Sequence, residues 1–248
     1  MRERNSMGRL RHAAVVACVA GMAVLLAGCL YPKENMQQNR GAANEAVRNV
    51  QAAVDQYLEV TGLLPIQNST PDVPKFEKFK LNFAKLQAKE MIGEIPSVAF
   101  EKGGNYYFIV IDEEKDPKVK LMDIVSMQKV NDIQIWMYQH IQNTGELPKL
   151  EAVYPGFYEI DYKTMGKTAP VLKSVYSGQT LRAVVDESGA VYLDYAIDIT
   201  QQLQKNGDAT LIGEEDDLRD LLVAASPFVP VKAPAYRLRD GEPVAVQP

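Results

Sequence analysis

Very few side chains in this 248-residue sequence could carry out nucleophilic or acid–base chemistry through a thiol or an imidazole. The chain has two cysteines, Cys18 and Cys29, and two histidines, His12 and His140. Cys18 lies inside an uncharged apolar run at residues 13–27, and His12 belongs to the basic segment before that run. Chemistry of this kind therefore depends on Cys29 and His140.

Cys29 stands directly after the apolar run and is preceded by Leu26, Ala27 and Gly28. A basic start, an apolar run of about 15 residues and small residues at its end are typical of a secretory signal. The run is shorter than the ~20 residues that a membrane-spanning helix needs. The segment is therefore predicted to direct the chain out of the cytoplasm.

The same four residues resemble the lipobox of bacterial lipoproteins, in which the cysteine is acylated and the chain is cut just before it. The resemblance implies a signal peptide at residues 1–28 and a mature chain that begins at Cys29. A palmitate-type lipid on Cys29 would hold the protein in the cell membrane, on its extracytoplasmic face. An ordinary cleaved signal, or an uncleaved anchor that contains a cysteine, is the alternative interpretation.

Cysteine usage limits the chemistry of the mature chain. Once Cys18 has left with the signal and Cys29 carries lipid, no further cysteine is present. We therefore expect neither a disulfide nor a cysteine-ligated metal site.

The charge balance argues against a nucleic-acid partner. The sequence has 27 Lys and Arg and 32 Asp and Glu; residues 1–28 contain four Arg and one Glu, so the mature chain keeps 23 basic and 31 acidic side chains. A net charge of −8 repels phosphate backbones and anionic headgroups. We therefore expect attachment to the membrane through lipid alone, with no nucleic acid bound.

The candidates for catalysis and metal binding are weak. His140 could serve as a general base, but its place on a helix face favours a packing role. Asp112, Glu113, Glu114 and Asp116 crowd one predicted turn, and residues 214–217 are four consecutive acids. Neither group has the alternating spacing of a calcium loop, and solvated turns or helix starts explain both. We assign no catalytic residue, no metal ligand and no cofactor.

A repeat at a constant offset of 83 residues is the main feature of the mature chain, and repeats are sought before motifs. Residues 47–65 align without a gap on residues 130–148. Both segments have apolar residues at helical spacing, a glycine where the pattern stops and a proline three residues later. The identical pairs are Val47/Val130, Gln51/Gln134, Gln56/Gln139, Thr61/Thr144, Gly62/Gly145, Leu64/Leu147 and Pro65/Pro148.

The similarity continues more weakly after the helices. Residues 79–83 resemble residues 158–162, and both alternate as a short strand or strand entry does. Hairpins are predicted at 106–122 and at 181–195, with Gly189 in the second turn. Each hairpin leads into another helical segment, 124–141 or 197–205. Two unrelated helices that share a capping pattern would be the alternative interpretation.

The sequence thus predicts an α+β fold with two tandem related helix-plus-antiparallel-hairpin units, at 42–123 and 124–206. A polar spacer at 29–41 precedes them. A C-terminal extension at 207–248 contains a helix from Glu214 to Ala225, a proline-rich stretch and a terminal hairpin that turns at Asp240–Gly241.

Several short segments resemble the YphF-like lipoproteins of Bacillus and related Gram-positive bacteria, a functionally uncharacterised family. They are Leu-Tyr-Pro after Cys29, the Val-Gln-x-x-Val-Asp-Gln-Tyr helix at 50–57, Leu-Leu-Pro-Ile at 63–66 and Ser-Pro-Phe-Val-Pro at 226–230. The resemblance implies a Gram-positive cell surface and supplies no catalytic residues.

Our leading hypothesis is a non-enzymatic envelope lipoprotein that serves as an interaction or scaffold module for another envelope protein. A solute-binding lipoprotein associated with an ABC-type transporter is the main alternative. A pocket between the two units, lined by aromatic residues, would favour it. A carboxylate-based cell-wall hydrolase is a weaker alternative.

Overall fold

The computed structural model describes residues 31–206, residue 213 and residues 215–247. Leu26, Ala27, Gly28 and Cys29 lie outside the described residues. Contacts divide the chain into two compact parts, residues 1–42 and residues 43–248. The second part contains the sheets and the cores described below.

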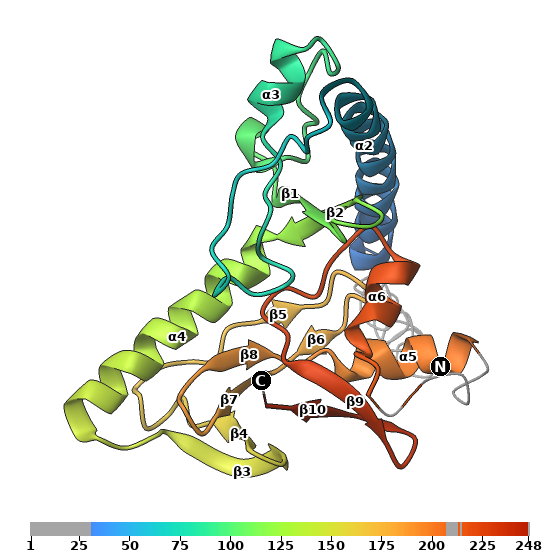
Figure 1. Cartoon of the computed structure of the whole chain (residues 1–248). Coiled ribbons are helices and arrows are strands. Elements are labelled where there is room, and N and C mark those ends of the chain that lie inside the picture. The colour runs from blue at the N-terminus through green and yellow to red at the C-terminus, as the bar shows by residue number, and fades with distance from the viewer. Residues whose placement is uncertain (1–30, 207–212, 214, 248) are drawn as a thin grey trace, which may run out of the picture. The chain divides into compact units, whose positions relative to one another are not determined.

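The fold is α+β, with helices and several small antiparallel sheets (Figure 1). One sheet pairs β1 (Tyr106–Ile111) with β2 (Lys118–Asp123). A four-stranded sheet has the order β3-β4-β7-β8. The strands of this sheet are β3 (Lys149–Tyr154), β4 (Phe157–Ile160), β7 (Ala183–Asp186) and β8 (Val191–Leu193). A short pair joins β5 (Leu172–Lys173) to β6 (Thr180–Leu181).

The two long helices end as the repeated sequence predicts. α2 (Tyr31–Thr61) is followed by Gly62 with φ 68°, and α4 (Ile124–Thr144) by Gly145 with φ 73°. The N–H of each glycine donates to a carbonyl of the last helical turn, at 2.8 Å in both cases. Glycine adopts this left-handed conformation without the strain that a side chain adds.

Substitution of either glycine is expected to be costly. Gly62→Val and Gly145→Val should each lower the free energy of unfolding by about 1 kcal/mol or more, because φ is positive at both positions. A Cβ atom added at either glycine would have no neighbour within 4 Å, so the cost comes from the backbone alone. Gly93→Val is the matched control, since Gly93 has equal space and no positive φ. Urea unfolding of the three variants measures the difference, and equal costs at all three glycines would contradict this explanation.

The start of α2 differs from the prediction. The sequence predicts a polar spacer at residues 29–41 and a helix that begins near residue 44, where the apolar spacing starts. The structure instead continues the helix back to Tyr31. The segment 31–41 contains good helix formers, such as Glu, Met, Gln and Arg, so it needs no apolar face to be helical.

The buried faces of the helices follow their apolar spacing. Val50 and Val54 of α2 are fully buried, as are Ile133 and Met137 of α4. They belong to a main core that also takes in the strands of both hairpins. A smaller core joins the first hairpin to the C-terminal part of the chain, and it consists of Phe76, Ile109, Met122, Val223, Val229 and Val231.

Both predicted hairpins form. In the first, Val110 pairs with Val119; in the second, Val185 pairs with Val191. The alternating segment at 79–83 forms only isolated bridges, Ile66 with Leu81 and Lys80 with Ile109. It ends early because the side chain of Asn82 accepts from the N–H of Lys85 and begins helix α3 (Phe83–Ala88).

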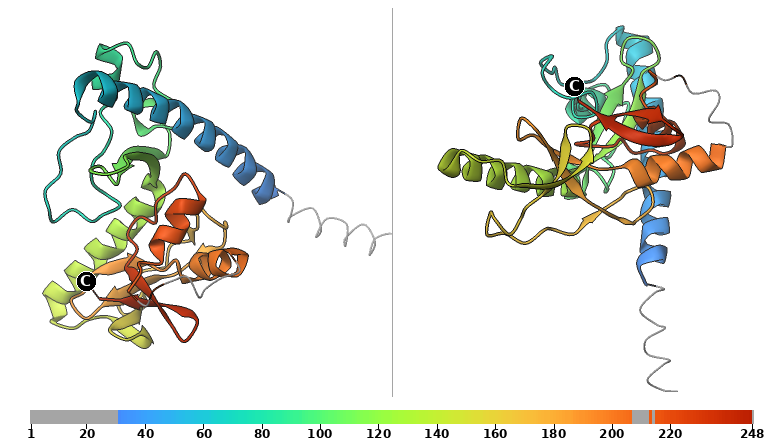
Figure 2. Two further views of the ribbon diagram at one scale, coloured as in Figure 1. Left: turned by 45° about the vertical axis from the view of Figure 1, so that its right-hand side comes forward. Right: turned by 90° about the horizontal axis from the view of Figure 1, so that it is seen from below.

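The tail contains α5 (Ala196–Asn206), α6 (Arg219–Ala225), β9 (Ala235–Arg239) and β10 (Glu242–Val246). The predicted terminal hairpin is thus present. The two views of Figure 2 show it (red) beside α5 (orange). The helix expected from Glu214 begins only at Arg219, because Asp217 accepts from the backbone N–H and the guanidinium of Arg219. Such local side-chain bonds favour a turn over a helix.

The proline-rich stretch between α6 and β9 connects the two hairpins. The N–H of Leu121 in β2 donates to the carbonyl of Pro227, and the N–H of Val229 donates back to Leu121. Farther along, the N–H of Leu193 in β8 donates to the carbonyl of Lys232. These backbone bonds hold residues 227–232 along the return strands of both hairpins.

Within the part of the chain that the structure describes, no helix is long and apolar enough to cross a membrane.

Candidate functional site

Gln51 links helix α2 to the first hairpin. Its side-chain Nε2 donates to the carbonyl of Pro117 at 3.0 Å, and its Oε1 accepts from the N–H of Val119 at 2.7 Å. Val119 lies in β2, the strand that returns from the hairpin turn, and Pro117 directly precedes that strand. The amide group therefore pairs with two backbone groups at the start of β2, which would otherwise lack a partner in the sheet.

Gln134, at the position aligned with Gln51, makes the same pair of bonds in α4. Its Nε2 donates to the carbonyl of Gly189, and its Oε1 accepts from the N–H of Val191, both at 2.8 Å. The two backbone partners are again two residues apart, at the start of a return strand. The sequence showed these glutamines only as identical residues, and their role depends on hairpins that lie more than fifty residues away.

A groove of about 950 Å³ lies beside Gln51. One wall is the face of α2 that carries Arg48, Ala52 and Asp55, and another is the turn and return strand of the first hairpin. Side chains from α6 and from residues 75–78 complete the lining. The groove is therefore built by segments that are far apart in the sequence.

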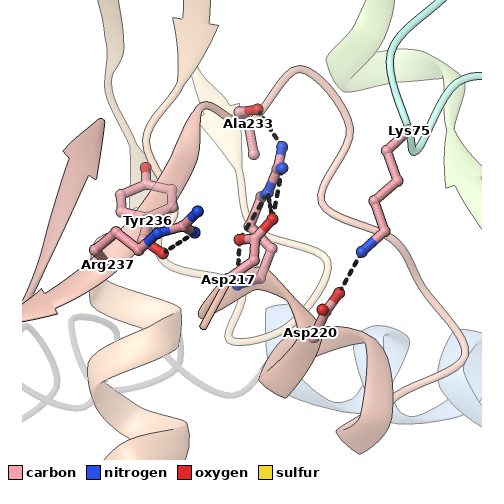
Figure 3. A network of polar contacts seen from close by, with 7 residues as sticks. Lys75, Asp217, Asp220, Ala233, Tyr236 and Arg237 are labelled. Carbon is pink, nitrogen blue, oxygen red and sulfur yellow. Dashed lines mark hydrogen bonds and ion pairs between the residues drawn. The ribbon is translucent and has the colours of Figure 1, made fainter. Parts of the chain in front are cut away.

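Both basic and acidic side chains line this groove. Lys75 pairs with Asp220 of α6 at 2.8 Å, as Figure 3 shows. Lys120 is half-buried, and its Nζ donates to the carbonyls of Val223 and Ser226 at 2.6 and 2.7 Å. Burial lowers the pKa of Lys120, and the nearby charge of Lys118 lowers it further. The bonds of Lys120 join the end of α6 to the first hairpin, whereas the exposed pair of Lys75 and Asp220 adds little.

Residues 43–123, which contain Gln51 and two walls of the groove, match the model of the YphF family N-terminal domain. The chain carries a YphF family N-terminal domain. No curated protein and no solved structure matches the chain. This YphF domain comprises the second half of α2, α3, β1 and β2. Its last residue, Asp123, accepts hydrogen bonds from the N–H groups of Val125 and Ser126 at the start of α4.

A smaller cavity of about 210 Å³ lies beside Gln134. Its lining includes Pro74, Phe76 and Glu77 of the YphF domain and Pro230, Lys232 and Ala233 of the tail. The ring of Phe76 is buried there, and the guanidinium of Arg219 lies 5.1 Å from its centre. Glu77 and Lys232 form a mostly buried ion pair at 3.0 Å, which joins the turn at 74–77 to the turn at 230–233.

A buried carboxylate, Asp194, ties the end of the second hairpin to the tail. It accepts from the guanidinium of Arg182 at 2.8 Å and from the hydroxyl groups of Tyr154 and Tyr236. Burial raises the pKa of the Tyr154 and Tyr236 hydroxyls, and the adjacent charge of Asp194 raises both further. Both phenols therefore remain neutral donors. Tyr236 also accepts from the N–H of Tyr195, so the network has a structural role.

His140 lies near the C-terminal end of α4 and is partly exposed. Its backbone carbonyl accepts from the hydroxyl of Thr144 at 2.9 Å, as the carbonyl of Tyr57 accepts from Thr61 at 2.7 Å. His140 and Tyr57, which are aligned in the repeat, thus have the same backbone hydrogen bond near the end of their helices. His140 is not among the residues that line either cavity.

The acidic residues singled out in the sequence are dispersed. Asp112 and Glu113 line the groove, whereas Asp116 pairs with Lys118 at 2.7 Å. Glu215 lies 3.6 Å from both Arg237 and Arg239. Figure 3 shows Asp217 beside the tail strand, where it binds Arg219. Among the residues that the structure describes, no group of three or more His, Cys, Asp or Glu side chains is placed to hold a metal ion.

Proposed function

We propose that the protein is a lipid-anchored surface lipoprotein that acts as a non-enzymatic interaction module in the cell envelope. The tether is Cys29, after a signal peptide that ends at the lipobox residues Leu26, Ala27 and Gly28. The module comprises residues 42–206 and the extension that follows. The observation that carries the proposal is the groove beside Gln51, which residues of a helix and a hairpin line from two sides.

We further propose that the module consists of two tandem related units, 42–123 and 124–206. The bonds of Gln51 and Gln134 support this, as do the two glycine helix ends. Other backbone bonds recur in the same order. The N–H of Asn82 donates to the carbonyl of Pro65, and the N–H of Asp161 donates to that of Pro148.

Strand pairing supports the same interpretation. Ile66 pairs with Leu81, and the aligned residues Lys149 and Ile160 pair at one end of β3. Lys80 pairs with Ile109, as Glu159 pairs with Val184. Two unrelated helices with a common capping pattern would share the helix ends only. Shared pairing between three segments in each unit favours duplication.

A non-enzymatic function is supported by how the polar side chains of the groove are used. Lys75 and Asp220 pair with each other, and Lys120 binds backbone carbonyls. These contacts give three polar side chains of the groove a partner within the chain. The lining combines charged side chains with apolar ones such as Val47, Val119 and Val223, a composition that suits an interface for another protein.

A solute-binding lipoprotein is the second candidate, because about 950 Å³ is within the range of small-molecule sites. The position and lining of the groove favour it less. The groove is formed by the first unit and the tail, and the residues described as lining it include no Tyr, Phe or Trp. A solute-binding lipoprotein was expected to have a pocket between the two units that is lined by aromatic residues.

Affinity capture from membranes tests the proposed function. The lipid-tethered protein is expected to retain a specific envelope protein, and Ala52→Trp should abolish that retention because the indole fills the groove. Ile135→Trp, at the corresponding exposed position of α4, is the matched control and should retain the partner. Capture that is equal for both variants, or a bound small molecule with no protein, would contradict the proposal.

A further inference from the structure

We propose that residues 227–232, in the connection from α6 to β9, act as a strap that closes the edges of two sheets against pairing with a second copy of this chain. The edges belong to β2 and β8, the return strands of the first and second hairpins. The inference does not depend on the groove beside Gln51 or on what occupies it. It comes from the backbone groups that point outward from these two strands.

The outer edge of β2 is closed in two steps. The amide of Gln51 pairs with the backbone at the start of the strand. Farther along, the N–H of Leu121 donates to the carbonyl of Pro227 at 2.8 Å, and the carbonyl of Leu121 accepts from the N–H of Val229 at 3.0 Å. Leu121 and Phe228 thereby form a parallel β-bridge. The strap therefore occupies the place of a further strand beside β2.

The outer edge of β8 is closed in the same order. The amide of Gln134 pairs with the backbone around Val191. Two residues later, the N–H of Leu193 donates to the carbonyl of Lys232 at 2.8 Å. Leu193 thus corresponds to Leu121, since each lies two residues beyond the N–H that a glutamine binds. One strap serves both sheets, with its first half on β2 and its last residue on β8.

Buried side chains hold the strap in place. Phe228, Val229 and Val231 are each at most 2% exposed. The ring of Phe228 lies 5.3 Å from the ring of Tyr106 in β1, and the carbonyl of Phe228 accepts from the hydroxyl of Tyr176 in the second unit. The strap is therefore anchored to both units.

Removal of the strap would leave the edge of β2 both unpaired and apolar. Leu121 and Met122 are fully buried in the folded chain. An apolar edge with unpaired N–H and carbonyl groups is a template for a strand of another chain. A second copy of this protein supplies an identical edge, which makes it the expected partner.

The other end of the four-stranded sheet is protected differently. β3 carries the exposed charges of Lys149 and Glu151, and its register with β4 shifts twice. Charged side chains and irregular pairing discourage association through an edge. The three residues of β8, Val-Tyr-Leu, carry no charge and pair with β7 in regular register. Protection of this edge therefore falls to Gln134 and the strap.

Two proline variants test the inference. Val229→Pro removes the N–H that binds Leu121, whereas Val231→Pro removes an N–H that donates to Val229 inside the strap. Both valines are fully buried and adjacent to Pro230, so the two variants lose the same side chain in similar surroundings. Analytical ultracentrifugation of the full-length lipidated protein in excess detergent measures association. We expect Val229→Pro to associate at concentrations about tenfold lower than the wild type or Val231→Pro.

Hydrogen exchange locates the association. In the associated Val229→Pro protein, the amides of residues 118–123 should exchange as slowly as in the wild type, because a strand of the second copy replaces the strap. In the dilute monomeric variant they should exchange faster. The inference is overturned if both proline variants associate equally, if a folded Val229→Pro protein associates no more than the wild type, or if its association leaves residues 118–123 in fast exchange.

A second pair of variants decides the matter if Val229→Pro does not fold. Gln51→Leu opens the start of the same edge and leaves the strap unchanged, whereas Gln56→Leu alters an exposed glutamine of the same helix. We expect Gln51→Leu to associate at concentrations about tenfold lower than Gln56→Leu, with slow exchange of residues 118–123 in the associated form. Equal association of these two variants overturns the inference.

Discussion

Replacing Gln51 or Gln134 by leucine is expected to lower the free energy of unfolding by about 2 kcal/mol or more in each case. Leucine has a similar volume but no amide group. It leaves one carbonyl and one N–H of the return strand without partners, and a partly buried group in that state costs about 1–3 kcal/mol. Similar losses at the two sites follow from their similar geometry. Urea unfolding of purified mature protein measures both.

The chain offers a matched control for this prediction. Gln56 and Gln139 are also identical in the two aligned segments, and both are exposed. Gln56→Leu and Gln139→Leu should change the free energy of unfolding by less than about 0.5 kcal/mol. If all four substitutions cost the same, or if only one of Gln51 and Gln134 matters, the two glutamines do not play equivalent roles.

Cys29→Ser is expected to abolish incorporation of labelled fatty acid and to leave the precursor uncut. Serine lacks the thiol to which the lipid would be attached. The protein should also lose the membrane affinity that acyl chains provide, at about 0.8 kcal/mol for each buried methylene group. Metabolic labelling followed by membrane fractionation measures both effects. Cys18→Ser is the control and should be labelled normally, because Cys18 belongs to the proposed signal peptide. Continued labelling of Cys29→Ser would show that the lipid is attached elsewhere.

The features that the sequence predicted well are those set by local chemistry. Gly62 and Gly145 end helices because only the adjacent turn decides whether a positive φ is needed. The turn at Asp240–Gly241 follows from two residues. The first and second hairpins were visible in their alternating strands. These are short-range signals, and each was confirmed where the structure describes it.

The features that the sequence did not predict depend on distant segments. In an amphipathic pattern, Gln51 and Gln134 are placed on the polar face, and nothing local shows that they bind a hairpin. The groove is lined in part by α6, in which Asp220 pairs with Lys75, a residue 145 positions earlier in the sequence. The late start of α6 depends on a single local bond network around Asp217, which competes with the helix dipole that favoured an earlier start.

The central claim, a non-enzymatic module that works through its groove, is tested most directly by complementation of a gene deletion with two variants. His140→Phe changes the one histidine after the proposed signal, and Ala52→Trp fills the groove; both must show wild-type unfolding temperatures. We predict that His140→Phe restores the wild-type phenotype and that Ala52→Trp behaves like the deletion. An enzyme that used His140 as its general base would lose about 10²-fold or more in rate. A well-folded His140→Phe protein that behaves like the deletion, together with a functional Ala52→Trp protein, would contradict the claim.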